Sequence, residues 1–254
     1  MPSVQVLITF DFEEWESKAD LYTKTKRIVD LLVERELPAT FFLDAETVLK
    51  YPEAARLLLD GRFELALHSD YHFTKNNSFP HDLDFSRQSH ETQVERLMKA
   101  ITMIRKVIPI FNPQGFRAPG LRWNEELYIS LRTLNFLYDS SQQDRFTFKP
   151  FLKNDIVVFP VNCGEHDSFC YKQKPQYVIN DWIDKFRGVH RVATEGLKPY
   201  FLILAHPSVS GKYKYVGVLK AILKHISYYD VEYTTCSEAA HRYLRERRLE
   251  LLQS

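Results

Sequence analysis

Two histidines, His68 and His72, lie four residues apart in the segment His68-Ser69-Asp70-Tyr71-His72. One helical turn or a compact loop of this spacing aims both imidazoles at a single ion. Two neutral imidazoles and one carboxylate would hold a divalent cation and leave positions open for water, as a catalytic metal site requires. The same spacing also occurs on ordinary protein surfaces, so the pair alone is a weak indication.

A cluster of acidic residues, Asp11, Glu13 and Glu14, follows an apolar segment near the start of the chain. Carboxylates this close together repel one another unless a cation or solvent compensates for them. Along a strand, alternate side chains point to the same side, so Asp11 and Glu13 would share one. One of the two would then bind a metal and the other would act as a base, with Glu14 solvated. The alternative is a solvated acidic turn.

The elements that must position these residues alternate between strands and helices. The hydrophobic pattern predicts strands over 4–10, 39–43, 63–67, 136–138, 156–161, 200–205 and 231–234. It predicts helices near 28–35, 47–59, 94–108, 124–134, 177–190, 216–225 and 237–250. This alternation indicates a mainly parallel sheet with helices outside it, either closed as a barrel or open and doubly wound.

Four polar residues fall at or just beyond the carboxyl ends of predicted strands: Asp11, His68, Asp139 and His206. Both architectures build their active sites at these strand ends. The coincidence favours one shared site. His166-Asp167 also follows a predicted strand, although an ordinary loop role is the simpler interpretation for this pair.

The composition predicts a globular protein of one domain over 1–254, since 44% of the residues are hydrophobic and 26% are charged. The formal net charge is +1, which gives no long-range attraction to nucleic acid or anionic lipid. Three cysteines without C-x-x-C spacing predict reduced thiols. We find neither a secretion signal nor a long apolar run, so the expected location is cytoplasmic, with no membrane span.

Six short motifs occur in order along the chain. They are Thr9-Phe10-Asp11-Phe12-Glu13, Ala39-Thr40-Phe41-Phe42, His68 to His72, Phe116-Arg117-Ala118-Pro119-Gly120, Tyr138-Asp139-Ser140-Ser141 and Leu204-Ala205-His206. Together they resemble the polysaccharide deacetylase family, of the carbohydrate esterase family 4 type, whose members share a NodB-like homology region. The resemblance implies an α/β fold with a distorted (β/α)7–8 barrel of the glycoside hydrolase/deacetylase type.

The resemblance also implies roles for individual residues. In this family a divalent metal, expected here to be zinc, is held by two histidines and a carboxylate. Carried over to this sequence, the ligands are His68, His72 and Glu13. Asp11 then takes the proton of the attacking water, and His206 protonates the departing amine, which leaves poorly unless it is protonated.

Two further residues are assigned supporting roles by the same resemblance. Arg117 would pair with Asp11 and keep it ionised, and Asp139 would orient His206 or line the substrate pocket. Without the family pattern, Arg117 would be a surface arginine beside a turn and Asp139 a helix cap or turn residue. Two aromatic residues close to motifs, Trp15 and Trp123, are candidates to line a sugar-binding cleft.

The first motif departs from the family pattern, because Phe12 separates the two acids that are adjacent in most members. The roles of Asp11 and Glu13 could therefore be exchanged. In the third motif, Gly120 stands where an aromatic residue is common, which alters the wall that faces the sugar.

The expected function is removal of an acetyl group from an N-acetylated sugar or glycan precursor by metal-activated water. Two alternatives stay open. One is a related hydrolase of C–N bonds, either a deformylase or an enzyme that opens cyclic imides or ureides. The other is a degenerate member of the family that binds a glycan without turnover.

Overall fold

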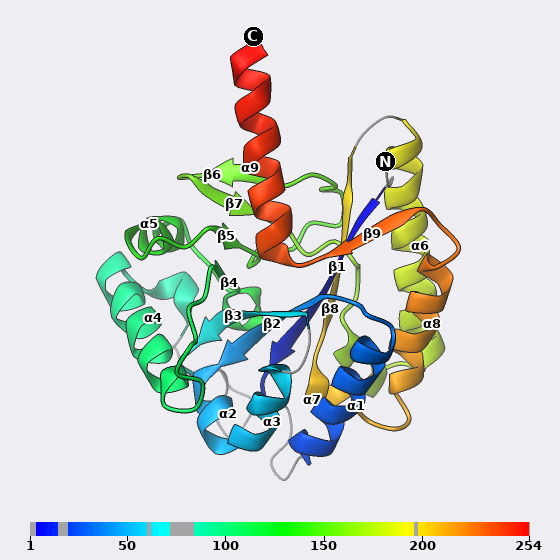
Figure 1. Ribbon diagram of the computed structural model, residues 1–254, viewed down its shortest axis with the longest axis horizontal. Helices are drawn as coiled ribbons and strands as arrows, with labels where there is room; N and C mark the ends of the chain where they lie inside the picture. Colours follow the sequence, from blue (N-terminus) through cyan, green and yellow to red (C-terminus); the bar gives the residue numbers. More distant parts are fainter. Residues whose placement is uncertain (1–3, 15–19, 60–61, 72–83, 196–197, 254) are drawn as a thin grey trace.

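The computed structural model describes residues 4–14, 20–59, 62–71, 84–195 and 198–253. A single curved sheet runs through the molecule, with helices packed around it (Figure 1). The strands are β1 (Val4–Phe12), β2 (Ala39–Asp44), β3 (Phe63–Ser69), β4 (Gly115–Phe116), β5 (Tyr138–Asp139), β6 (Phe151–Lys153), β7 (Ile156–Val158), β8 (Tyr200–Ala205) and β9 (Val231–Thr234).

The helices follow the strands in the expected alternation. They are α1 (Leu21–Glu34), α2 (Ala45–Lys50), α3 (Pro52–Arg56), α4 (His90–Arg105), α5 (Glu126–Thr133), α6 (Pro175–Thr194), α7 (Pro207–Ser210), α8 (Val216–Ile226) and α9 (Cys236–Gln253). Short 3-10 turns are η1 (Leu57–Leu59), η3 (Phe85–Arg87), η4 (Pro119–Leu121) and η5 (Asp167–Tyr171). No helix in the described ranges is both long enough and apolar enough to cross a membrane.

The strand order is β6-β7-β5-β4-β3-β2-β1-β8, and β9 also pairs with β1. All of these pairs are parallel except β6 with β7, which are antiparallel. The sheet curls into a half-barrel with helices outside it, which confirms the α/β fold of the distorted-barrel type. Because the strands are parallel, the carboxyl ends of β1, β2, β3 and β8 lie at one edge of the sheet.

Strand β1 pairs with three other strands. Its neighbour β8 pairs with it from Gln5 to Phe10, β2 pairs with its carboxyl half, and β9 pairs with its amino half. Surrounded in this way, Val6, Leu7, Ile8 and Phe10 are completely buried. Burying one such side chain stabilises the fold by about 1.5–3 kcal/mol. The strand also continues to Phe12, beyond its predicted end, so Asp11 belongs to the sheet itself.

Most predicted elements are present with shifted ends. The strands expected over 200–205 and 231–234 have those bounds, as β8 and β9. The prediction of one helix over 47–59 is wrong. It is divided into α2, α3 and η1, because Pro52 cannot donate the backbone hydrogen bond that would continue α2.

Gly115, in the short strand β4, packs directly against the buried ring of Tyr138. A Cβ atom at this position would lie 1.8 Å from Cζ of that ring. We predict that Gly115→Ala lowers the free energy of unfolding by about 3 kcal/mol or more, because both groups are buried and overpacking forces the strands apart. Urea denaturation followed by circular dichroism measures the change.

Gly188 provides the matched control, since it lies within α6 and no atom within 4 Å would meet its Cβ. Gly188→Ala is expected to raise stability by about 0.5–1 kcal/mol, the difference in helix propensity. Equal effects of the two substitutions would contradict the packing of β4 against β5.

Candidate active site

Asp11 and Glu13 are the two acids at the carboxyl end of β1. Only 4% of Asp11 and 1% of Glu13 is exposed to solvent. Phe12 between them is fully buried, and the amide of Glu13 donates to the carbonyl of Asp11 over 3.1 Å. This turn brings both carboxylates to the same edge of the sheet, so a strong compensating charge must lie close to them.

Arg117, which follows β4, supplies that charge to Asp11. Its Nη1 lies 2.7 Å from Oδ1 of Asp11, and the arginine is completely buried. Nε and Nη2 donate to the carbonyl and the hydroxyl of Ser140, and the guanidinium stacks 4.0 Å above the ring of Phe42. The expected ion pair is therefore present. Burial alone would raise the pKa of Asp11, but the charges of Arg117 and of the neighbouring histidines hold it below its usual value.

His68, near the end of β3, faces Glu13. Nδ1 of His68 lies 2.8 Å from the carbonyl oxygen of Arg117, to which it donates. Nε2 is then directed at the acids, 3.2 Å from Oε2 of Glu13 and 3.8 Å from Oδ2 of Asp11. Burial opposes the charging of His68, but the carboxylates of Asp11 and Glu13 outweigh burial and raise its pKa. A histidine fixed through Nδ1 presents Nε2 as a metal ligand.

The turn that follows His68 is anchored by a buried ion pair. Asp70 accepts from Nε and Nη2 of Arg96, on α4, over 2.9 and 2.6 Å. Ser69, which also receives a bond from Arg96, has a φ angle of 127°, a conformation that L residues rarely adopt. Such a backbone persists where its surroundings hold it, as Arg96 does here.

His206, directly after β8, approaches Glu13 from the other side. Its Nε2 lies 3.4 Å from Oε1 of Glu13. Its Nδ1 and its backbone amide both bond to the carboxylate of Asp167, over 2.6 and 2.9 Å. Burial would lower the pKa of His206, but the charge and hydrogen bond of Asp167, followed by the charges of Glu13 and Asp11, raise it to about 9.

Asp167 is a site residue to which the motifs assign no role. It is 1% exposed, lies in η5, and also accepts from the hydroxyl of Ser210 in α7 over 2.6 Å. The only signal in the sequence is that His166-Asp167 follows a predicted strand. Its pairing with His206 joins residues 39 positions apart, which local patterns do not predict.

The structure therefore brings together Asp11, Glu13, His68, Arg117 and His206. The expectation that Asp139 orients His206 is wrong, because the carboxylate bonded to Nδ1 of His206 is that of Asp167. Asp139 is buried and accepts hydrogen bonds from Ser141 and Tyr128.

The sequence also suggested roles for His72, Trp15, Trp123 and Glu14. His72, expected as a metal ligand, and Trp15, expected to line a cleft, lie outside the described residues. Trp123 packs edge-on against Tyr128, with ring centroids 5.6 Å apart. The expectation that Glu14 is solvated is wrong, because its carboxylate bonds to Lys50 and to the hydroxyl of Tyr51.

Two groups of side chains are candidates to hold a metal ion. One combines Glu13 and His68, with Asp11 beside them. The other is His166, Asp167 and His206, whose nearest donor atoms lie within 4.8 Å of one another. In the second group, both oxygens of Asp167 already accept hydrogen bonds from His206, and one also accepts from Ser210. A cation there would have to displace these donors.

The first group fits a divalent cation better. It joins an oriented imidazole nitrogen to a buried carboxylate, the donors that zinc prefers. A third buried acid, Asp44, lies at the end of β2. Burial raises the pKa of Asp44 to about 6, and the charge of the nearby His68 opposes this rise. Within the described ranges, Oδ2 of Asp44 has no hydrogen-bond partner. A cation would balance this surplus of carboxylates.

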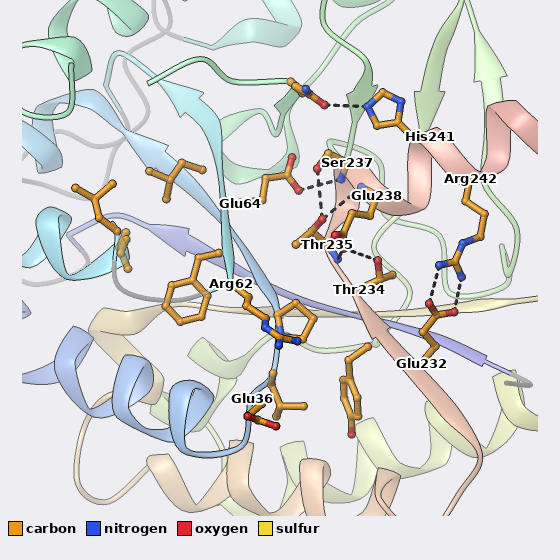
Figure 2. A pocket seen from close by; sticks show the side chains of 18 of the residues that line it. Glu36, Arg62, Glu64, Glu232, Thr234, Thr235, Ser237, Glu238, His241 and Arg242 are labelled. Carbon is orange, nitrogen blue, oxygen red and sulfur yellow. Dashed lines mark hydrogen bonds and ion pairs between the residues drawn. The ribbon is translucent and has the colours of Figure 1, made fainter. Parts of the chain in front are cut away.

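A large groove of about 1770 Å³ lies elsewhere, at the amino ends of β2 and β3. Figure 2 shows Glu64 reaching across to Ser237 at the start of α9, whose amide donates to it over 2.9 Å. None of the acids and histidines described above lines this groove. Its size therefore does not identify it as the place of the chemistry.

Asp139 makes the stability of the protein depend on pH. Burial raises the pKa of Asp139 from 3.8 to about 6, against the opposing hydrogen bonds of Ser141 and Tyr128. The native state therefore favours the protonated acid, so its contribution to stability is present below the unfolded pKa and is lost as the pH rises through about 6. The rise corresponds to up to about 3 kcal/mol.

We predict that wild type loses this much stability relative to Asp139→Asn between about pH 4 and pH 7. Urea denaturation of both proteins across this range measures the difference, and other titrating groups cancel in the comparison. A difference that stays constant with pH would contradict the prediction.

Comparisons with known proteins identify the family and show similar folds. A family model described as polysaccharide deacetylase matches residues 1–138. No curated protein matches the sequence. A Mycobacterium smegmatis protein assigned to the polysaccharide deacetylases has a similar structure, with a TM-score of 0.78 and 19% identity over 97% of this chain and 92% of that one.

Other similar structures differ in their described activity. The Puue allantoinase has a TM-score of 0.77 and 14% identity, over 95% of this chain and 90% of that one. A CE4 family pseudoenzyme from Bacillus anthracis has a TM-score of 0.61 and 14% identity, over 94% of this chain and 66% of that one. These likenesses concern the fold, and the match to the family model extends over more than half of the sequence. The chain belongs to the polysaccharide deacetylase family.

Proposed function

We propose that this protein is a metal-dependent hydrolase that removes an acetyl group from an N-acetylated sugar or glycan precursor. The observation that carries the proposal is the position of Glu13, whose two carboxylate oxygens lie 3.2 Å from Nε2 of His68 and 3.4 Å from Nε2 of His206. Glu13 is therefore a buried acid between two histidines. His68 is oriented as a metal ligand would be, and His206 is oriented by the carboxylate of Asp167.

The residues proposed to hold the metal are Glu13 and His68, joined by His72 on the family pattern. Zinc is the expected ion, because nitrogen and oxygen donors of this kind suit it. When bound, such a cation polarises the acyl carbonyl and makes water acidic enough to attack near neutral pH.

Asp11 is proposed to take the proton of the attacking water. Its ion pair with Arg117 fixes one of its oxygens and keeps the group ionised, which a base requires. Oδ2 faces the site, 3.8 Å from Nε2 of His68. The pairing with Arg117 also favours Glu13 over Asp11 as the metal ligand, because a carboxylate shared with arginine donates less charge to a cation.

His206 is proposed to protonate the leaving amine, with Asp167 as its positioning residue. Asp167 holds Nδ1 and so turns Nε2 toward the site, as a carboxylate does in hydrolases that use an oriented histidine. The carboxylates around His206 favour its protonated form, which is the form that donates.

Two alternative functions can be distinguished from deacetylation by comparing substrates. A related C–N hydrolase would use the same residues on a formyl group or a cyclic imide, as the fold shared with an allantoinase allows. A member without turnover would bind a glycan only. Release of acetate from acetylated amino sugars, measured beside release of formate and opening of allantoin, separates the three.

Metal content and acetate release of His68→Ala test the proposal. We expect the variant to lose stoichiometric metal and acetate release to fall by at least about 100-fold, because an oriented ligand is removed. His241→Ala is the control, since His241 is an exposed histidine at the far groove. Metal retained in His68→Ala would contradict the assignment of this ligand.

Asp167→Asn tests the positioning role separately. We predict that kcat falls by about 100-fold, the usual contribution of an oriented general acid, while metal content stays at the wild-type level. The asparagine keeps the size of the side chain and removes its charge. If the variant loses its metal, the ion is bound by His166, Asp167 and His206 instead, and our assignment of Glu13 and His68 is wrong.

A further inference from the structure

Two lysine-rich segments follow the two short elements, η5 and α7, that adjoin His206. The first is Tyr171-Lys172-Gln173-Lys174, which begins at the end of η5. The second is Gly211-Lys212-Tyr213-Lys214-Tyr215, which follows α7 directly. Together they carry four lysines and no acidic residue.

Aromatic contacts hold the two segments together. The rings of Tyr171 and Tyr215 meet edge-to-face, with centroids 5.7 Å apart. Nζ of Lys212 lies 4.4 Å above the ring of Tyr171, and Nζ of Lys214 lies 4.7 Å above that of Tyr215. Nζ of Lys172 is 5.6 Å from the ring of Phe169. These cation–π contacts restrict the ammonium groups while leaving them hydrated.

The segments are joined to the proposed general acid by the elements that precede them. Asp167 begins η5 and bonds to His206, while Ser210 ends α7 and bonds to Asp167 over 2.6 Å. In Figure 1, α7 lies at the carboxyl end of β8, at the edge of the sheet where β1 also ends. The lysines thus follow directly from the two elements that hold the His206–Asp167 pair.

Three of the four lysines in this cluster carry a charge that no described acidic residue pairs with. In the described part of the chain, Lys172, Lys174 and Lys214 have no ion-pair partner, and all three are exposed. The other side of the site is different, because Glu14 and Glu46 accompany Lys50 there. Among the residues that the structure describes, positive charge is therefore concentrated on the side of His206.

We propose that these lysines bind an anionic group, phosphate or carboxylate, carried by the amino-sugar substrate. This inference rests on the proposed function, since a general acid must lie against the nitrogen that leaves with the sugar. The sugar then occupies the side of His206, and its substituents reach the lysine cluster. A neutral sugar would gain no charge attraction from these exposed ammonium groups, whereas an anionic one would be attracted and oriented by them.

The test compares N-acetylglucosamine with N-acetylglucosamine 1-phosphate and with N-acetylmuramic acid, the carboxylated arm. Calorimetry on the metal-loaded protein measures binding, and acetate release measures turnover. We expect at least one anionic sugar to bind about tenfold or more tightly than the neutral one, with a preference that weakens as salt is added. The anionic sugar that binds more tightly shows whether the lysines prefer a phosphate or a carboxylate.

Lys172→Gln combined with Lys214→Gln should reduce the preference for the anionic sugar about tenfold. The matched control removes two exposed lysines of α8, in Lys220→Gln with Lys224→Gln, and should leave the preference unchanged. Equal affinity for all three sugars, or equal effects of the two double variants, would overturn the inference.

The two proposals fail in distinguishable ways. Acetate released equally well from neutral and anionic sugars would keep the deacetylase and reject the anion site. Tighter binding of an anionic sugar that depends on Lys172 and Lys214, without release of acetate, would keep the anion site and reject the deacetylase.

Discussion

Two carboxylates, Asp11 and Glu13, are buried side by side at the end of β1, and such like charges coexist away from water only where cations oppose them. The opposing groups come from three other strands: Arg117 after β4, His68 on β3 and His206 after β8. Removing one member of a buried ion pair typically costs about 3–5 kcal/mol, so the requirement ties the ends of these strands together. The parallel register of β1 with β2 and β8 makes this possible, because it brings the strand ends to one edge.

The compensating charge is divided unequally between the two acids, and we propose that this division gives them different roles. Arg117 bonds to Asp11, while Glu13 contacts both imidazoles. The insertion of Phe12 between the acids is consistent with the division: Phe12 fills the core, and the longer glutamate reaches from the turn after β1 toward both histidines. The departure from the adjacent acids common in the family thus preserves the separation between a base and a metal ligand that we propose. Asp167 serves His206 in the same way that the carbonyl of Arg117 serves His68, because each fixes Nδ1 and directs Nε2 inward.

Much of the fold could be predicted from the sequence because the long strands are continuous apolar runs, and parallel pairing then fixes where their ends meet. Strands β4 and β6 were not predicted, since two or three residues produce no periodic signal. The motifs predicted the ion pair of Arg117 with Asp11, but for Asp139 they suggested either orienting His206 or lining the substrate pocket. The structure shows Asp167 beside His206 instead, in a 3-10 turn whose position depends on the packing of η5 against α7. Side chains brought together by such turns leave no spacing pattern. The lysine cluster was missed for the same reason, because its two halves are separated by all of α6 and β8.

The central claim is that a divalent cation binds between Glu13 and His68, while Asp11 stays with Arg117. Anomalous diffraction from zinc-loaded crystals, collected on both sides of the zinc absorption edge, tests it most directly. The account predicts one strong peak about 2.0–2.2 Å from a carboxylate oxygen of Glu13 and from Nε2 of His68, with the ion pair between Arg117 and Asp11 intact. A peak coordinated by His166, Asp167 and His206, or by Asp11 after release from Arg117, would contradict it.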